Sequence, residues 1–594
     1  MNARLPLAAS MRHFAPLRGL FVRNRWPLLA GFASLLLVDG LQLAIPLVIK
    51  RAVDALAADR ATAMLLLAYG GWIVALAAAM AVFRYVWRSF LLGHSRMVEA
   101  EIRSRLFSHL QTLSPKFFQE KTTGDLMARA VNDLNAIRMA TGMGLAALTD
   151  GLLMGAAAIG FMMAIDVELT LWALIPAPFV VALTRVYTRR MSRSYERVQK
   201  TFGALTERVR EAFSGIRVVM AYGREDWVSS RVREEGENYV AENIRLARTL
   251  GVFFPMMSVF TNLGLAIVVW RGGGLAIVGE ISTGGFVAFT TYLNLLTWPM
   301  MAMGWVTNLI QRGGASMQRI NQVLDTPPDI TGPPESEHAP SGVKGELSTK
   351  NLTFTYAGAN RPALENVSLA IPKGAFAVVV GPVGSGKSTL ACSFARMVDV
   401  EPGQVFVDGT DVTRYPLSVL RKNIGFVPQE PVVFSDTLAA NVAFGRKDVG
   451  REAVEKALGA VRLLEEIDDT KGGINAVLGE RGVTLSGGQR QRLTLARALA
   501  GDPPVLIADD ALSMVDTRTE KAVMEEILKL RAGRTTVVVT HRVGVMQKAD
   551  VVFVLEKGRL AESGTHEHLL AAGGPYARLY ERQLLAEDLE KGGS

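Results

Sequence analysis

Residues 381–388 read Gly381-Pro-Val-Gly-Ser-Gly-Lys-Ser388, which matches the phosphate-binding pattern G-x-x-x-x-G-K-S. They follow the strand-like run Phe376 to Val380 and precede a helix-like segment, which is the order of a P-loop. Glycines let backbone N–H groups approach phosphates, Lys387 supplies a positive charge, and the Ser388 hydroxyl can ligate magnesium. This context favours a nucleotide-binding α/β domain over a glycine-rich turn that matches by chance.

A second strand-like run, Val505 to Asp509, ends in a carboxylate. Enzymes with a P-loop need a carboxylate at this point to orient magnesium. An ordinary strand end is the alternative for this run taken alone, so a further motif has to decide between them.

That motif is Leu485-Ser-Gly-Gly-Gln489, which an Arg-rich helix-like segment and then the Asp509 strand follow. A serine and two glycines at the start of a helix form a second phosphate-binding end. With these residues the chain resembles the ABC transporter family over nearly its full length. The resemblance implies ATP and Mg2+ as ligands, with ATP held at a dimer interface between this helix start and the P-loop of the opposite subunit.

The resemblance assigns further residues in chain order. Tyr356 is implied to stack on adenine, Gln429 lies in the Pro428-Gln429-Glu430 loop, Ser513 to Asp516 form the D-loop, and His541 is the switch histidine. A strand aromatic, a solvated loop residue and a capped histidine are the structural alternatives for Tyr356, Gln429 and His541.

The implied site residues fall into three groups. The catalytic group is Asp510, His541 and Gln429, and the magnesium group is Ser388, Gln429 and Asp509. The nucleotide-binding group is Tyr356, Gly381, Gly384, Ser385, Gly386, Lys387, Ser388, Thr389, Ser486, Gly487, Gly488, Gln489 and Asp516.

The N-terminal half differs in composition from this domain. The chain has 594 residues, is 49% hydrophobic and carries a net charge of +9, which favours a membrane protein with basic loops. No basic arm or helix stands apart from the apolar runs, so nucleic acid is not expected as a partner. The apolar stretch from residue 26 is too long for a signal peptide and predicts a retained first membrane helix.

Six membrane helices are predicted, at 26–50, 62–92, 139–164, 167–188, 249–271 and 284–310. The long connections 93–138 and 189–248 are helix-patterned and rich in Arg, Lys and Glu, so the positive-inside rule places them in the cytoplasm. The second and fourth helices run into these stretches without Gly or Pro breaks, which predicts helices that extend beyond the bilayer.

The expected fold is therefore an α-helical membrane domain of six long transmembrane helices with cytoplasmic extensions, followed by an α/β ABC ATPase domain. We expect a transmembrane domain at 1–325, a Pro-rich linker at 326–345, the ATPase domain at 346–585 and a tail at 586–594. This order resembles the exporter class of the family. Within that resemblance, 117–133 and 222–227 are the coupling segments, and Gly479-Glu480-Arg481-Gly482 is similar to an exporter-specific loop.

The residue after Asp509 departs from the family pattern, because Asp510 stands where an active ATPase of this class has glutamate. Aspartate is one methylene shorter, about 1.5 Å, and misplacement of about 1 Å can cost a hundredfold in rate. The signature motif is intact, and the resemblance implies that it acts on the partner's nucleotide. The chain thus resembles the Asp-bearing half of bacterial heterodimeric multidrug exporters in the inner (plasma) membrane, with a Glu-bearing partner; a slowly hydrolysing homodimer and tolerated drift are the alternatives.

Ionisable residues within the apolar spans are candidates for the transport pathway. Asp39 lies in the middle of the first span. Arg84 and Arg88 lie toward the cytoplasmic end of the second span, where snorkelling or helix pairing also explains a charged side chain. Few charges favour amphipathic drugs, lipids or hydrophobic peptides as cargo. A regulatory pseudo-ATPase that gates a pathway, and a soluble ABC ATPase acting on DNA or ribosomes, are the competing functions. The single cysteine, Cys392, excludes a disulfide framework within the chain and is expected as a small buried hydrophobe.

Overall fold

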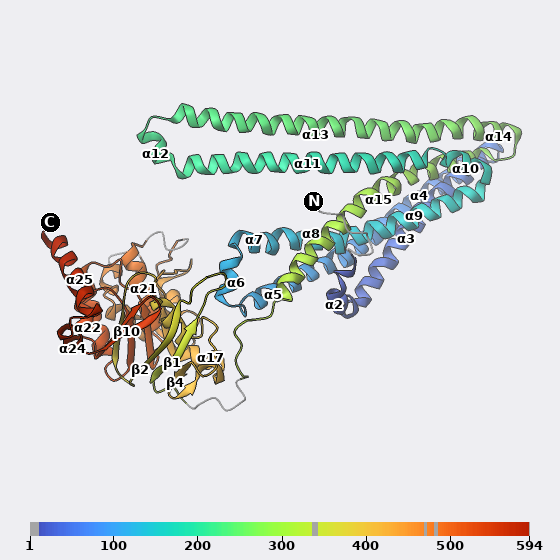
Figure 1. Cartoon of the computed structure of the whole chain (residues 1–594). Coiled ribbons are helices and arrows are strands. Elements are labelled where there is room, and N and C mark those ends of the chain that lie inside the picture. Colours follow the sequence, from blue (N-terminus) through green and yellow to red (C-terminus); the bar gives the residue numbers. More distant parts are fainter. Residues whose placement is uncertain (1–10, 335–341, 469–471, 480–484, 593–594) are drawn as a thin grey trace. The chain divides into compact units, whose positions relative to one another are not determined.

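The computed structural model describes residues 11–334, 342–468, 472–479 and 485–592. The chain forms two compact units, one of 1–111 with 122–326 and one of 112–121 with 327–594. The first unit consists of helices, and the second contains all the strands among the described residues (Figure 1).

Long helices interrupted by single π turns make up the first unit. A π turn adds one residue to a helical turn and shifts the faces that follow it. The segments are η1 (Ala15–Leu17), α2 (Arg18–Arg23), α3 (Arg25–Ala57), α4 (Ala63–Trp87), η2 (Arg88–Leu92), α5 (Gly93–Leu110), α7 (Thr123–Ala128), η3 (Arg129–Asp133), α8 (Leu134–Met139), η4 (Ala140–Gly144), α9 (Leu145–Ile165), α10 (Val167–Leu174), α11 (Ala177–Ser214), α12 (Ile216–Ala221), α13 (Glu225–Ile267), η5 (Val268–Gly272), α14 (Gly273–Val278) and α15 (Thr283–Leu324).

Five of these continuous helices are long and apolar enough to cross a membrane. They are Arg25–Ala57, Ala63–Leu110, Thr123–Ile165, Val167–Ser214 and Glu225–Val278. The sixth predicted span corresponds to α15, which has 42 residues and includes Asn294 and Pro299 among its apolar residues. The helical membrane fold is thus confirmed, and the helices run past the predicted ends of the apolar stretches because charged helical turns continue them.

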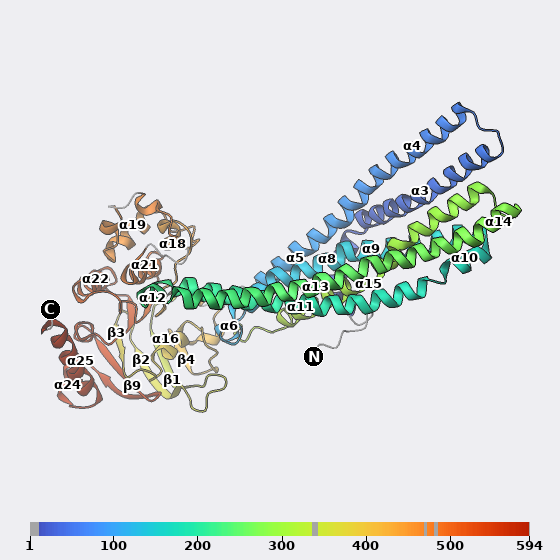
Figure 2. The same ribbon diagram turned by 90° about the horizontal axis from the view of Figure 1, so that it is seen from above.

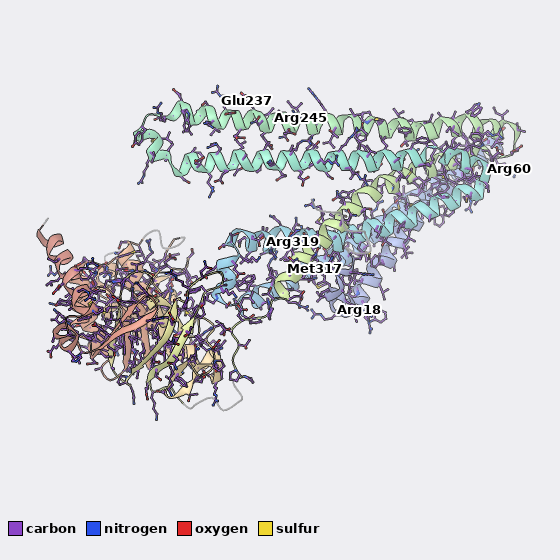
Figure 3. The ribbon with its side chains drawn as sticks, viewed as in Figure 1. Arg18, Arg60, Glu237, Arg245, Met317 and Arg319 are labelled. Atoms are coloured by element: carbon purple, nitrogen blue, oxygen red, sulfur yellow. The ribbon has the colours of Figure 1, made fainter. Side chains whose placement is uncertain are left out.

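The extensions of α11 and α13 lie side by side and are joined by α12 (Figures 1 and 2). Cross-helix ion pairing contributes to this contact, since the Arg197 guanidinium lies 2.9 Å from the Glu242 carboxylate and Glu242 also pairs with Arg245. Figure 3 shows the charged side chains that project from both helices, Glu237 and Arg245 of α13 among them. The prediction that the fourth helix extends into a charged helical stretch is confirmed.

α15 packs against η3 and η4 through a buried polar contact and a close backbone approach. Asp133 of η3 accepts hydrogen bonds from the Ser316 hydroxyl at 2.9 Å and from Nε of Arg319 at 2.9 Å (Figure 3). One turn earlier on α15, a Cβ placed on Gly313 would collide with Cβ of Ala140 and lie 3.2 Å from the carbonyl oxygen of Ala136. Small residues at this crossing let the helix backbones approach closely.

The second unit contains two sheets. The larger one has six strands in the order β10-β9-β3-β8-β7-β6, in which β9, β3, β8, β7 and β6 are parallel and β10 pairs antiparallel at the edge. The smaller antiparallel sheet has the order β2-β1-β4-β5. The strands are β1 (Leu347–Phe354), β2 (Leu364–Ile371), β3 (Phe376–Val380), β4 (Val405–Val407), β5 (Thr410–Asp411), β6 (Ile424–Val427), β7 (Val505–Asp509), β8 (Thr535–Val539), β9 (Val551–Glu556) and β10 (Arg559–Gly564).

Alternate residues of the central strands pack into two separate cores. In β7, Leu506 and Ala508 join one core, and Val505 and Ile507 join the other. Burial on both faces explains why the strand reads as a continuous apolar run. The α/β ATPase fold predicted from these runs is confirmed.

Helices cover the sheets and carry the turns that follow the strands. The segments are α6 (Pro115–Glu120), α16 (Lys387–Phe394), η6 (Val412–Arg414), α17 (Leu417–Lys422), α18 (Leu438–Ala443), α19 (Arg451–Ala460), α20 (Leu464–Asp468), η7 (Gly473–Asn475), α21 (Gly487–Leu499), α22 (Thr517–Leu530), α23 (Val543–Met546), α24 (His566–Ala571) and α25 (Pro575–Gly592). α6 lies at the start of the first segment that resembles a coupling segment, and it belongs to the unit of the ATPase fold. The Ser114 hydroxyl just before it donates to the Asp329 carboxylate at 2.8 Å.

Replacing Gly313 by alanine is expected to destabilise the first unit by about 1 to 3 kcal/mol, because the added methyl overpacks the crossing of α15 and η4. The measurement is the thermal unfolding temperature of the purified protein. Gly160→Ala in α9 is the control, since nothing lies within 4 Å of a Cβ at Gly160. Equal unfolding temperatures for the two variants would show that the close approach at Gly313 does not limit packing.

Candidate ATP-binding site

Four predicted site elements meet at one edge of the six-stranded sheet. β3, β8, β7 and β6 are neighbours in that order and run parallel, so their carboxyl ends lie on the same edge. Gly381 directly follows β3, His541 follows β8, Asp509 ends β7 and Gln429 follows β6. Ligands of open parallel sheets bind outside these strand ends, so the fold brings the predicted residues together.

The P-loop turn depends on the backbone of Gly386. This residue is the N-cap of α16 and has a φ of 96°, in the left-handed region that favours glycine. A Cβ at this position would also collide with the carbonyl oxygen of Ala363. The turn leaves the first N–H groups of α16 without partners in their own helix, which is the arrangement that binds phosphate.

Lys387 begins α16 and is 8% exposed. Its ammonium donates to the carbonyl oxygens of Gly381 and Pro382, at 2.8 Å each. Burial lowers the pKa of Lys387, and the charges of Asp509 and Asp510 act in the opposite direction. The carbonyl groups of the loop thus hold a mostly buried cation beside the phosphate-binding turn.

Asp509 and Ser388 form the magnesium pair predicted from the sequence. The Ser388 side chain interacts with the Asp509 carboxylate, which is 4% exposed. Burial raises the pKa of Asp509, while Ser388 and the charge of Lys387 lower it. A hydroxyl beside one carboxylate fits Mg2+, which takes oxygen ligands and completes its shell with phosphate oxygens and water. No cluster of three or more His, Cys, Asp or Glu side chains suited to a metal occurs in the described part of the chain.

His541 lies near both charges of this edge. Burial lowers the pKa of His541, the charge of Lys387 lowers it further, and the charge of Asp510 raises it. The depressed pKa favours the neutral imidazole at physiological pH, so one ring nitrogen can donate and the other can accept.

Asp510 has an unusual backbone conformation. Its φ is 48°, and its N–H donates to the carbonyl oxygen of Val539 at 3.0 Å. Aspartate adopts the left-handed region at lower cost than most non-glycine residues. The local backbone therefore offers a structural reason for aspartate at 510.

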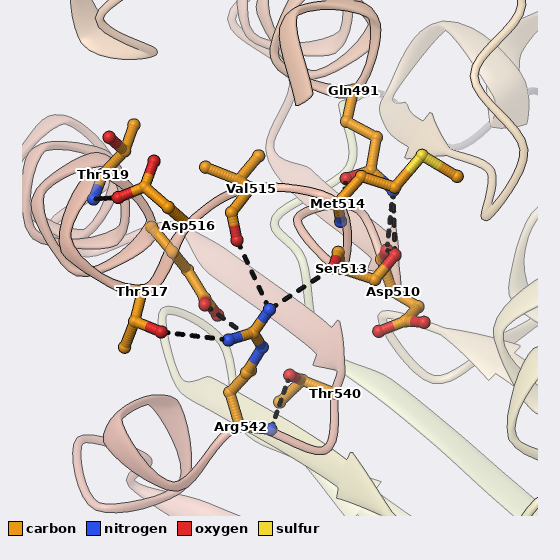
Figure 4. Close-up of polar contacts among 11 residues, drawn as sticks. Gln491, Asp510, Ser513, Met514, Val515, Asp516, Thr517, Thr519, Thr540 and Arg542 are labelled. Atoms are coloured by element: carbon orange, nitrogen blue, oxygen red, sulfur yellow. Dashed lines mark hydrogen bonds and ion pairs between the residues drawn. The ribbon is translucent and has the colours of Figure 1, made fainter. Parts of the chain in front are cut away.

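Two side chains that the sequence analysis did not single out hold the D-loop (Figure 4). The amide of Gln491, 1% exposed, donates to the Ser513 hydroxyl at 2.9 Å and accepts from the N–H of Met514 at 2.8 Å. The Arg542 guanidinium donates to the carbonyl oxygens of Ser513 and Val515, at 3.3 Å each. Gln491 lies two residues after the signature and Arg542 directly follows His541, so proximity to motifs was the available signal.

The signature start of α21 is closed by a capping box. The Ser486 hydroxyl accepts from the N–H of Gln489 at 3.2 Å, and the Gln489 side chain accepts from the N–H of Ser486 at 2.9 Å. Glu466 then accepts from Gln489 at 3.0 Å and from both terminal nitrogens of Arg492, at 2.7 and 2.9 Å. A Cβ at Gly487 would lie 2.9 Å from Sδ of Met514, so the signature glycines lie against the D-loop.

The structure joins some of the remaining predicted residues to the site and leaves others apart. The Tyr356 hydroxyl hydrogen-bonds to that of Thr389 at 3.1 Å, and the ring is 39% exposed. Gln429 is exposed. Asp516 caps α22 by accepting from the N–H of Thr519 at 2.9 Å, which lowers its pKa. Across the described segments, no hydrogen bond connects the signature residues Ser486 to Gln489 with the P-loop.

Two further predictions concern the exporter-type loop and Cys392. Glu480, Arg481 and Gly482 of the exporter-type loop lie outside the described residues. Cys392 in α16 is half-buried, and burial raises the pKa of its thiol to about 11. The thiol therefore stays protonated at neutral pH.

Comparisons with known proteins identify the family of the chain. The description "ABC transporter transmembrane region" matches residues 28–300, and "ABC transporter" matches residues 364–513. The chain is 35% identical to the Bacillus subtilis probable multidrug resistance ABC transporter ATP-binding/permease protein YheI, over 94% of this chain and 95% of that protein. It is 34% identical to the Escherichia coli multidrug resistance-like ATP-binding protein MdlA, over 98% of each chain.

A flippase and a solved exporter are also similar. The ATP-dependent lipid A-core flippase of Chromohalobacter salexigens is 32% identical over 95% of this chain and 96% of the flippase. A structure of a bacterial Atm1-family ABC exporter with ATP bound aligns with a TM-score of 0.77 and 27% identity, covering 96% of this chain and 98% of that one. The fold and the site define a P-loop ATPase fused to a membrane domain. This chain belongs to the ABC transporter family and is an exporter-type half-transporter.

Arg542→Lys is expected to lower kcat for ATP hydrolysis by roughly tenfold or more, because lysine lacks the fork that holds two D-loop carbonyl groups and misplacement is costly. KM for ATP should change little, since Arg542 acts on the loop and not on nucleotide. Steady-state ATPase kinetics of the assembled transporter measure both.

Arg534→Lys is the matched control, because Arg534 is partly exposed and pairs with Asp502 at the far end of β8. A loss in Arg542→Lys no larger than in this control, at equal unfolding temperatures, would contradict the positioning role.

Proposed function

We propose that this chain is one subunit of an ATP-driven exporter whose own P-loop site is catalytically impaired and whose signature serves the active site of a partner chain. The observation that carries the proposal is that an intact, doubly capped signature helix and Asp510 occur in the same ATPase unit. The intact signature helix favours a role in ATP turnover. Asp510, in contrast, has a side chain one methylene shorter than the glutamate that usually serves as the base.

The rate of hydrolysis depends on where the carboxylate that orients the attacking water lies. An attacking water is oriented by a carboxylate next to the γ-phosphate, and short reach lowers the rate steeply. The left-handed φ of Asp510 makes a compensating backbone shift costly, because its N–H is held by the Val539 carbonyl. Persistent ATP binding at Lys387 and hydrolysis at the partner's P-loop follow from this asymmetry.

The proposed cargo is hydrophobic or amphipathic: drugs, lipids or peptides moved out of the cytoplasm or the inner leaflet. Two similar proteins are named for multidrug resistance and one for flipping lipid A-core, and cargo of this kind suits spans with few charges. α4 has no buried residue within this chain, so its apolar surface is available to lipid, cargo or the partner. We place the chain in the bacterial inner membrane with its ATPase domain, residues 346–585 after the linker 326–345, in the cytoplasm.

A substitution that keeps the helix cap and reverses the local charge tests the role of the signature. Ser486→Asp preserves an N-capping side chain but places a carboxylate where phosphate is expected. ATPase activity of the assembled transporter should fall on the order of a hundredfold, as for loss of a charge-stabilising donor. Thr565→Asp is the control, because Thr565 caps α24 in the same way, accepting from the N–H of His568 at 3.4 Å.

Asp510→Asn completes this experiment. A less than twofold loss in the same assay is expected, because Asp510 serves the slow site. Equal losses from Ser486→Asp and Asp510→Asn would indicate a slowly hydrolysing homodimer. Retained ATP binding without ATP-dependent accumulation of a lipophilic dye in inside-out vesicles would indicate a regulatory pseudo-ATPase.

A further inference from the structure

Asp39 is a buried carboxylate near the middle of the first membrane helix. It is 4% exposed and lies on α3, within an apolar stretch that meets the criteria for a membrane span. Neither of its carboxylate oxygens accepts a hydrogen bond from an N–H or hydroxyl group of the residues that the structure describes. An ionised carboxylate without a partner is costly in such surroundings. The group that Asp39 faces therefore decides its protonation state.

That group is a second carboxyl. α9 packs against α3, and its Asp150 side chain neighbours the side chain of Asp39. Two carboxyl groups hydrogen-bond to one another only when one of them is protonated, because an ionised carboxylate has no donor. Two like charges in contact also resist joint ionisation.

One positive charge balances the pair. Arg84 of α4 attracts Asp39, while its guanidinium donates to the Gln42 side chain at 3.2 Å. Among the other elements that pack on α3, η2 carries Arg88 one turn beyond Arg84. The charged residues of α15, Arg312 and Arg319, lie about 30 Å or more along that helix from Tyr292, whose hydroxyl donates to the Leu43 carbonyl.

The net charge of the two carboxyl groups and Arg84 is zero when the pair holds one proton. A protonated carboxyl, one carboxylate and the Arg84 guanidinium sum to zero, which a membrane interior favours. Two ionised carboxylates would leave a net negative charge beside α4. A groove of about 660 Å³ along α4 and η2 is lined by Arg84, Arg88, Tyr85 and Ser89, among others.

We propose that Asp39 and Asp150 form a proton-binding site within the membrane domain. A proton from water adds to one carboxylate oxygen, and the resulting O–H donates to the carboxylate of the other residue. Deprotonation returns the proton to water and leaves two carboxylates that repel each other. Protonation therefore joins α3 to α9, and alkaline pH weakens that contact. This site is independent of the assignment of the two ATP sites.

Chemical modification tests for the proton directly. Dicyclohexylcarbodiimide reacts with protonated carboxyl groups in apolar surroundings. In the assembled transporter in lipid vesicles we expect at most one adduct on the Asp39 and Asp150 pair, more at mildly acidic than at alkaline pH. Asp54, on the same helix, is the internal control, because its carboxylate accepts from the N–H of Gly284 at 2.8 Å and from the Ser282 hydroxyl at 3.1 Å. Labelling of the pair no greater than that of Asp54 would overturn the proposal.

Asp39→Asn tests the consequence for stability. We expect the unfolding temperature of the unmodified transporter to fall at alkaline pH. The amide N–H of the introduced asparagine can donate to Asp150 without an added proton, so this fall should disappear in the variant. Asp54→Asn should retain that fall. An unchanged pH dependence in Asp39→Asn would contradict the proposal.

Infrared spectra of the unmodified transporter provide a test that needs no folded variant. A protonated carboxyl C=O band should be present at neutral pH and should fade as the pH is raised in step with carbodiimide labelling. Absence of the band would overturn the assignment. Protection of the pair from carbodiimide by sodium chloride but not by choline chloride, at constant pH, would identify a metal-cation site and also overturn it.

Discussion

The buried Asp509 carboxylate at the end of β7 interacts with Ser388, on the helix after β3. β8 lies between these two strands, so this contact fixes the edge at which the P-loop, His541 and Asp510 meet. The two cores on either side of the sheet hold the strands in register. Because the carboxylate is mostly removed from water, its charge acts at short range on Lys387 and on any magnesium that Ser388 helps to bind.

The same ATPase unit carries two helix starts suited to phosphate, and they are built differently. α16 begins at a left-handed glycine and leaves its first N–H groups available. α21 begins at a serine engaged in a capping box, and Glu466 with Arg492 anchors that turn from outside. Gln491 of α21 connects the second start to the loop after Asp510, and Arg542 holds the same loop from the end of β8. A change at the signature helix thus reaches the D-loop of the same chain.

The parts that the sequence predicted well are those encoded by neighbouring residues. The P-loop, the apolar strand runs and the signature each fit within a few residues, and parallel pairing then brings them to one edge. Gln491, Arg542 and Glu466 were missed because their partners are distant in sequence: Arg542 reaches back to Ser513, and Glu466 reaches forward to Arg492. The φ of Asp510 arises from tertiary contacts, so the sequence identified the missing methylene but not the backbone strain. In the membrane unit, Asp39 was singled out as a pathway residue, whereas its burial against Asp150 required the packing of α3 on α9.

The central claim is that ATP is bound between two chains and that the site at Lys387 keeps its nucleotide intact. The most direct measurement is a structure of the assembled transporter during turnover with Mg2+ and ATP. Our account predicts ATP between Lys387 and the partner's signature, and hydrolysed nucleotide facing Ser486. Nucleotide in contact with one chain only, or equal hydrolysis at both sites, would contradict it.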